Sequence, residues 1–295
     1  MEIWVLIAIG AAFFQNIRSA LQKHLKCQLS TTGATFSRLV FAAPLIACVL
    51  VMLLTVGGYS LPILNARSLG FMALGGVSQI TATALLVHLF GLRNFAVGTT
   101  FSKTETVQAA LFGVIVLADA ITPMAVLALF VSLLGVVLIS STNGLRGGKF
   151  NRGALIGIVS GTAFAVSGIS YRGASLSLGG GDFLIRATFT LACVLVFQTF
   201  IMAAWLAWKD SAQIGRVLKS WRVSMWVGVA GGLASLGWFS AMTLQNAAYV
   251  KAVGQIELLF SFAVSVLVFK ERSNGREVGG ILLVSAGILL LLLWR

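Results

Sequence analysis

Two glutamates stand at matching positions inside long apolar stretches of this chain. Fourteen residues separate Glu105 from Asp119, and the same number separates Glu257 from Glu271. At the rise of an α-helix this spacing is about 21 Å, which would place both glutamates deep in a bilayer core. A buried carboxylate of this kind can carry a proton across a membrane or bind the ammonium group of a substrate. Pairing with a basic residue, or capping an interrupted helix purely for packing, is the alternative.

Two lysines accompany these glutamates. Lys103 shares a helix face with Thr99, and Lys251 shares one with Gln255, because the members of each pair are four residues apart. Two ammonium groups that reach one cavity from the two halves of the chain would suit a solute with a carboxylate or phosphate group. Ion pairs with Glu105 or Glu257, or exposure of the Lys251 amine at the membrane surface, explain the lysines equally well.

Further polar residues lie in other apolar stretches. Gln15, Asn16 and Arg18 give the first stretch a polar face, which either lines a cavity or contacts another helix. Arg38 and Arg186 stand only about 9 and 6 Å inside the starts of their stretches, so anchoring at the membrane surface is the favoured interpretation.

Three aromatic residues are candidates for lining a cavity. Tyr171, Tyr249 and Trp238 fall in stretches that we expect to be inner helices. Their rings would suit an amphiphilic solute, although packing between helices is the commoner use of such side chains.

The composition identifies the environment in which these residues act. The 295 residues are 58% hydrophobic and only 10% charged, with a mean hydropathy of +0.99. A soluble domain carries about a quarter charged residues, so we expect an integral membrane protein. No phosphate-binding loop, dinucleotide-binding or zinc motif occurs, so neither a cofactor nor a bound metal is expected.

Ten stretches are long and apolar enough to cross a bilayer as helices. Their continuous apolar character excludes the alternating strands of a β-barrel and predicts an all-α membrane protein. The stretches are 3–22, 32–55, 68–90, 95–117, 122–142, 153–174, 182–208, 222–244, 247–269 and 277–294.

The chain contains an internal repeat. A shift of 152 residues superposes Glu105 on Glu257, Asp119 on Glu271 and Gly135 on Gly287 without a gap, and shifts of 148 to 156 extend the match upstream. The predicted units are 1–145 and 146–295, with five helices each. Five is an odd number, so the second unit must be inverted relative to the first, which is typical of secondary transporters.

The basic residues give an orientation. Of the 21 lysines and arginines, thirteen fall in the loops after odd-numbered stretches or at the edges of these loops, three after even-numbered stretches, at the edges of those loops or at the C-terminus, and five further inside the stretches. Because basic loops stay in the cytoplasm, this distribution predicts that both termini lie outside. A nucleic-acid partner is not indicated by the net charge of +13, since this charge gathers on one membrane face.

The chain resembles the drug/metabolite transporter superfamily, EamA type. The resemblance rests on two five-helix units that each end in an acidic residue, a short turn and a glycine-containing last helix. These elements are FGVIVLADAITPMAVLALFVSLLGVVLI and VSVLVFKERSNGREVGGILLVSAGILLL, together with FFQNIRSALQK in the first stretch and Arg38 in the second. The resemblance implies a ten-helix carrier of small metabolites whose termini lie in the cytoplasm, opposite to the prediction from charge.

Two departures from the family pattern affect the expected mechanism. The family often has proline where Thr106 and Leu258 stand, so we expect straighter fourth and ninth helices. Small multidrug members use a glutamate of the first helix as the proton site, whereas this chain offers Gln15 and Asn16, so that mechanism does not carry over.

Together these features predict a secondary transporter, not an enzyme, in the cell (inner) membrane. The expected partners are an amino acid or a similar zwitterionic or anionic solute, and membrane lipids, with the protein a monomer or homodimer. A membrane-embedded enzyme acting on lipids would need clustered Asp, His or Cys, whereas the acidic residues are dispersed. A passive channel or lipid scramblase is the third alternative.

Overall fold

A computed structural model describes residues 2–25, 27–89, 102–141, 152–260 and 275–293. Helices form the regular secondary structure of the described part, apart from an isolated antiparallel bridge between Ile63 and Gly179. Continuous apolar sequence favours helices in a membrane because every backbone group is then bonded within its own segment. The helices are α1 (Ile3–Leu25), α2 (Thr31–Thr55), α3 (Ala66–Leu89), α5 (Glu105–Leu117), α6 (Pro123–Ser141), α7 (Arg152–Ser177), α8 (Phe183–Lys209), α9 (Ala212–Lys219), α10 (Trp221–Leu244), α11 (Ala247–Gly254) and α13 (Gly275–Leu293).

Six of the described helices, α1, α2, α3, α7, α8 and α10, are long and apolar enough to cross a membrane. The helices α5, α6 and α13 are shorter apolar elements. Large apolar side chains such as Phe200 and Ile115 are exposed on the outside of the bundle, where lipid would surround them. The protein is therefore a multi-pass membrane protein, as the composition predicted.

The helix boundaries agree with eight of the ten predicted stretches to within a few residues. For 95–117 and 247–269 the structure describes only part of each stretch, so the count of ten stays a prediction. One difference is α9, which occupies a segment that we expected to be a loop. Its apolar residues Ile214 and Val217 turn inward while Arg216 and Lys219 stay exposed, which makes a short amphipathic helix.

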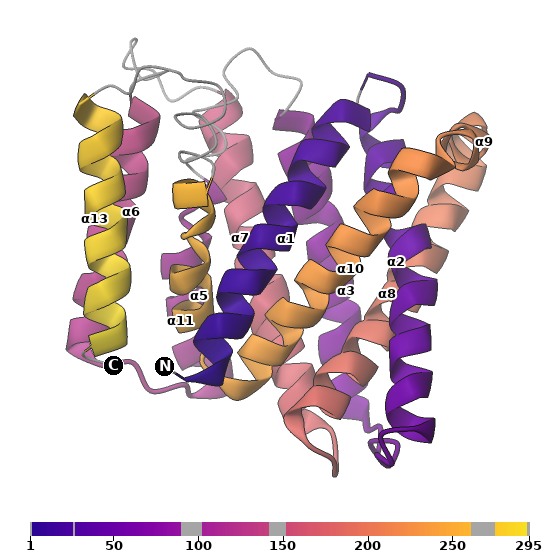
Figure 1. The fold of residues 1–295 in the computed structure, drawn as a ribbon, viewed down its shortest axis with the longest axis horizontal. Helices are drawn as coiled ribbons and strands as arrows, with labels where there is room; N and C mark the ends of the chain where they lie inside the picture. The colour runs from indigo at the N-terminus through magenta and orange to yellow at the C-terminus, as the bar shows by residue number, and fades with distance from the viewer. Residues whose placement is uncertain (1, 26, 90–101, 142–151, 261–274, 294–295) are drawn as a thin grey trace.

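The helices pack as a bundle in which segments far apart in sequence lie together. The most extensive contacts are α3 with α7, α6 with α13 and α1 with α10, followed by α2 with α10 and α8 and by α5 with α7. The pair α6 and α13 forms one end of the bundle, whereas α2, α8 and α9 lie at the other (Figure 1). Two buried apolar clusters result, one around α2 and α8 and one around α6, α11 and α13.

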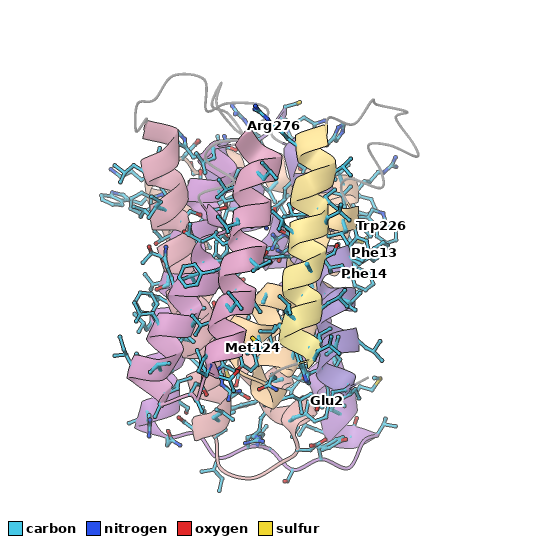
Figure 2. The ribbon with its side chains drawn as sticks, turned by 90° about the vertical axis from the view of Figure 1, so that its left-hand side faces the viewer. Glu2, Phe13, Phe14, Met124, Trp226 and Arg276 are labelled. Atoms are coloured by element: carbon cyan, nitrogen blue, oxygen red, sulfur yellow. The ribbon has the colours of Figure 1, made fainter. Side chains whose placement is uncertain are left out.

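The two ends of the chain lie on the same face of the bundle (Figure 1). The opposite face carries exposed basic residues, including Lys209, Arg216, Lys219 and Arg222. Figure 2 shows Glu2 near the face of the termini and Arg276 on the basic face. The sorting of basic residues to one face thus agrees with the sequence, whereas the side of the membrane to which this face belongs stays a prediction.

Small residues allow α6 and α13 to approach closely (Figure 2). A Cβ atom on Gly135 would lie 2.6 Å from the carbonyl oxygen of Gly280, and one on Gly287 would lie 2.7 Å from the backbone nitrogen of Ser132. Backbone meets backbone at both places, so neither neighbour can move aside. Gly135 and Gly287 are also equivalent positions of the sequence repeat.

We expect Gly135→Ala and Gly287→Ala to lower the melting temperature of the purified protein in detergent by several degrees each. The reason is overpacking, which typically costs about 1–3 kcal/mol. Intrinsic fluorescence or a thiol-reactive dye during heating measures the change.

Gly279→Ala is the matched control on the same helix, because its Cβ would make only an ordinary contact of 3.5 Å with Leu138. Equal melting temperatures for Gly135→Ala and Gly279→Ala would contradict close packing of α6 on α13.

Candidate functional site

A cavity of about 340 Å³ lies between α1, α3, α5, α7, α10 and α11. This volume suits a small organic solute. Nine of the twelve residues predicted from the sequence as candidates for the site line the cavity: Gln15, Asn16, Arg18, Lys103, Glu105, Tyr171, Trp238, Lys251 and Glu257.

The helices that carry the lysines and glutamates are interrupted beside the cavity. Turns at residues 103–104 and 255–256 precede helical stretches that begin at Glu105 and Glu257. The helix α5 is 13 residues long and α11 is 8, so the two breaks lie about 20 and 12 Å from the face of the termini. In a hydrocarbon core about 30 Å thick, both breaks fall near the middle.

The expectation of straighter helices at these positions is therefore wrong. Proline is not required here because other groups hold the second break open. The Trp238 ring packs so closely on Gly254 that a Cβ atom there would collide with it. Gln255 binds side chains of two neighbouring helices, donating to the Thr106 hydroxyl at 3.0 Å and accepting from Ser132.

The charged residues pair across the two breaks. Lys103 forms an ion pair with Glu257, and the Lys251 Nζ lies 3.5 Å from the Glu105 carboxylate. Each lysine thus meets the glutamate of the other repeat. Lys251 belongs to the last turn of α11 and Glu105 to the first turn of α5, so each charge also has the sign that the helix dipole favours there.

Polar side chains of α1 and α10 surround Glu257. Gln15 donates from Nε2 to the carboxylate at 3.1 Å, and Asn16 donates to the Glu257 backbone carbonyl at 2.9 Å. The Trp238 indole donates in turn to Gln15 at 2.9 Å, and the Lys251 ammonium lies 5.6 Å from the Trp238 ring centre. The polar face of the first helix therefore belongs to the cavity.

The other three candidates have different places. Gln255 is buried beside the cavity and borders a void of about 10 Å³, close to the volume that one water needs, which both lysine–glutamate pairs also border. Tyr249 does not line the cavity, because its ring is buried in the apolar cluster around α11. Thr99 lies outside the described residues.

A second polar network was missed by the sequence analysis. The Gln79 Oε1 atom lies 3.1 Å from Arg38 Nη2, 2.9 Å from the Tyr171 hydroxyl and 3.0 Å from Gln198 Nε2. Arg38 is 2% exposed, so the expectation that it anchors at the membrane surface is wrong. The available signal was the lone glutamine in each of the stretches 68–90 and 182–208, since a buried amide needs a polar partner.

An ion pair on the face of the termini was also missed. Arg172 is not among the site residues predicted from the sequence; it lies in α7, and its guanidinium contacts the Asp119 carboxylate at 3.0 Å. Its Nη1 atom donates to the carbonyl oxygens of Met242 and Gln245, both at 2.8 Å. One side chain therefore ties α7 to the end of α5 and to the end of α10; we call this contact the Arg172 clamp.

The lysine–glutamate pairs can be tested by a double-mutant cycle on thermal stability. Lys103→Gln alone leaves Glu257 without its ion-pair partner, which in a buried setting typically costs about 3–5 kcal/mol. We expect Lys103→Gln and Glu257→Gln each to lower the melting temperature, and the double variant to regain most of the loss. Arg222→Gln, an exposed charge on α10, serves as the control. Additive losses would mean that the two side chains do not interact.

Comparisons with known proteins agree with this architecture. No curated protein matches the sequence. Among solved structures 28 chains match, and one of them, described only as the crystal structure of a protein, has a TM-score of 0.73 at 14% sequence identity. The match covers 100% of this chain and 97% of that chain, so the two share a fold.

The family comparison applies to the first half of the chain. Residues 2–141 match the model of the EamA-like transporter family. This half contributes Lys103, Glu105 and the polar face of α1 to the cavity. Because the match spans 140 of the 295 residues, the first half of the chain is similar to the EamA-like transporter family.

Proposed function

We propose that this protein is a secondary active transporter of a small amino acid or a similar zwitterionic or anionic metabolite, in the cell (inner) membrane. The observation that carries the proposal is the cavity near the middle of the membrane, with two crossed lysine–glutamate pairs at two broken helices. Substrate sites at interrupted helices between repeated halves are typical of secondary transporters.

Two inverted halves, 1–145 and 146–295, would move against each other around this cavity. The pattern of helix contacts supports a two-fold relation. If α1, α2 and α3 correspond to α7, α8 and α10, then the contact of α3 with α7 is equivalent to that of α10 with α1. In the same way, the contact of α2 with α10 is equivalent to that of α8 with α3.

Proton binding at a glutamate would change the charge that the cavity offers. The charged groups around the pairs are Glu105, Glu257, Lys103, Lys251 and Arg18. When Glu257 binds a proton it no longer neutralises Lys103, whose ammonium becomes free to attract an anion. A proton and an anionic group would therefore enter together, which couples solute movement to the proton gradient.

Uptake into proteoliposomes tests this mechanism. L-amino acids and monocarboxylates, each radiolabelled and tested singly, are the probes. We expect at least one to show saturable exchange with unlabelled solute inside, with uptake that rises as the external pH falls. Glu105→Gln and Glu257→Gln should remain folded and lose most of the pH-dependent part, because an amide cannot carry the proton.

The exposed carboxylate variant Asp182→Asn is the control and should behave as the parent protein. Linear flux without exchange would indicate a channel, and parental pH dependence in both glutamine variants would remove the proposed coupling.

The Arg172 clamp would close the cavity on the face of the termini in the conformation described here. It fastens three chain segments together at that face through one guanidinium. Alternating access requires that such contacts break when the cavity opens to the other side. Release of the clamp is therefore the expected step of opening toward the termini.

Cysteine labelling measures this opening. The reporter is a cysteine at Ser167, which lines the cavity, in a protein whose own cysteines Cys27, Cys48 and Cys193 are replaced. We expect Asp119→Asn to increase labelling by a membrane-impermeant maleimide applied from the face of the termini several-fold, because the clamp loses its carboxylate. Labelling equal to that of the Asp182→Asn control would exclude a gating role.

A further inference from the structure

Two arginines beside the cavity carry charges that the described residues leave uncompensated. Arg18 lines the cavity and is 6% exposed, and its Nε atom is buried without a hydrogen-bond partner in the described part of the chain. Arg38 is 2% exposed, and among the described residues its Nε and Nη1 atoms are likewise buried and unpartnered. Buried cations normally have a carboxylate or several hydrogen-bond acceptors around them.

The two arginines share one place in the bundle. A Cβ atom on Gly231 of α10 would lie 2.7 Å from Arg38 Cγ and 3.3 Å from Arg18 Cδ. Both arginine side chains therefore pack against the backbone of α10 at Gly231. The absence of a side chain at Gly231 leaves the room for them. Two like charges are therefore held close together, with Arg18 at the wall of the cavity and Arg38 behind it.

The acidic side chains that the structure describes lie elsewhere, and Glu2 accepts a hydrogen bond from the Trp4 indole at 2.6 Å. Glu105 and Glu257 bind the two lysines, and Asp119 binds Arg172. Asp182 caps α8 with an exposed side chain, and Asp210 is exposed at the end of α8. No ion pair of Arg18 or Arg38 is found within the part of the chain that the structure describes.

Gln79 cannot supply the missing acceptors. Its single side-chain oxygen already accepts hydrogen bonds from Arg38, Tyr171 and Gln198. The network fixes one end of the Arg38 guanidinium and leaves the rest of its hydrogen-bonding capacity unused. It therefore orients Arg38 but does not neutralise it.

The second half of the chain has an equivalent of Arg38, which is Arg186 at a shift of 148 residues, but it has no equivalent of Arg18. The shift of 151 residues that relates the first helices of the two repeats places Ile169 opposite Arg18, and Ile169 is buried in an apolar cluster. The shift of 156 that relates the third helices places Ser235 opposite Gln79. Symmetry of the fold therefore does not require Arg18, which points to a role in recognition.

We propose that Arg18 and Arg38 form the subsite that binds the anionic group, a carboxylate or phosphate, of the transported solute. This inference rests on the proposed transport function and changes one part of the expectation from sequence, in which Lys103 and Lys251 were the anion contacts. Lys103 becomes available to an anion only after Glu257 binds a proton, whereas the two arginines are without an ion-pair partner among the described residues already in the described conformation. Arg18 contacts the anion from the cavity wall, and Arg38 is a positioning residue that adds charge behind it.

Ligand-induced thermal shifts of the full-length protein in detergent test the subsite. The probes are benzoate, phenyl phosphate, benzamide and benzylamine, which share one ring and differ in the charge of the attached group. We expect benzoate or phenyl phosphate to raise the melting temperature and the neutral and cationic probes to have little effect, since a ligand stabilises the state that binds it. The better of the two anions identifies the carboxylate or phosphate as the preferred group.

Variants separate recognition from packing. Arg18→Gln should weaken the apparent anion affinity at least about tenfold, the size of a lost charge-assisted hydrogen bond, and Arg38→Gln should weaken it less, because Arg38 does not contact the anion. Without ligand they should melt no lower than the parent protein, because they remove an uncompensated charge. Arg18→Lys should retain part of the anion effect, and the exposed variant Arg67→Gln is the matched control on α3.

Three results would overturn the inference: no anion-specific shift at millimolar concentrations, anion shifts unchanged in Arg18→Gln and Arg38→Gln, or unliganded variants that melt well below the parent. The proteoliposome assay is read separately. Saturable exchange with unchanged anion shifts in the variants rejects the subsite and keeps the transporter. Arginine-dependent anion shifts without transport of any probe keep the subsite and reject the transporter.

Discussion

Charged side chains near the middle of a bilayer must find partners within the protein, because neither water nor lipid headgroups are within reach. In this bundle each lysine pairs with the glutamate of the other half of the chain, so that Lys103 contacts Glu257 and Lys251 contacts Glu105. Neither half could bury its own lysine and glutamate in this way alone. The pairs therefore hold the halves in register and line the space between them with separable charges.

The interrupted helices follow from the same constraint. A continuous helix satisfies its own backbone, whereas a break leaves donors and acceptors that need other partners. Here the breaks coincide with the charged residues, so that the ends of α5 and α11 face ions of favourable sign. Trp238 and Gln15 complete the arrangement by connecting α10 and α1 to Glu257. The free backbone groups at the helix breaks and the buried charged side chains thus find their partners at the same place beside the cavity.

Much of this organisation could be predicted from the sequence. Long apolar stretches gave most helix boundaries, and the 152-residue shift brought Glu105 and Glu257 to equivalent positions beside the cavity. The partners of these residues could not be predicted, because an ion pair and a ligand site require the same residue types. Arg38 was misplaced since its depth was counted from the start of its own helix, whereas α3 and α10 cover it in the bundle. Arg172 was missed because two of its acceptors are backbone carbonyls, which leave no trace in residue types.

That last contact has a consequence for the evolution of the fold. Arg172 donates to the backbone carbonyl oxygens of Met242 and Gln245. The contact therefore depends on where these two oxygen atoms lie and not on which side chains the two residues carry. Sequence drift at 242 and 245 would leave the contact intact as long as α10 ends at the same place. Selection would act on the length of α10 and on the pair Arg172 and Asp119. Insertions or deletions between α10 and α11 should therefore be tolerated far less than substitutions there.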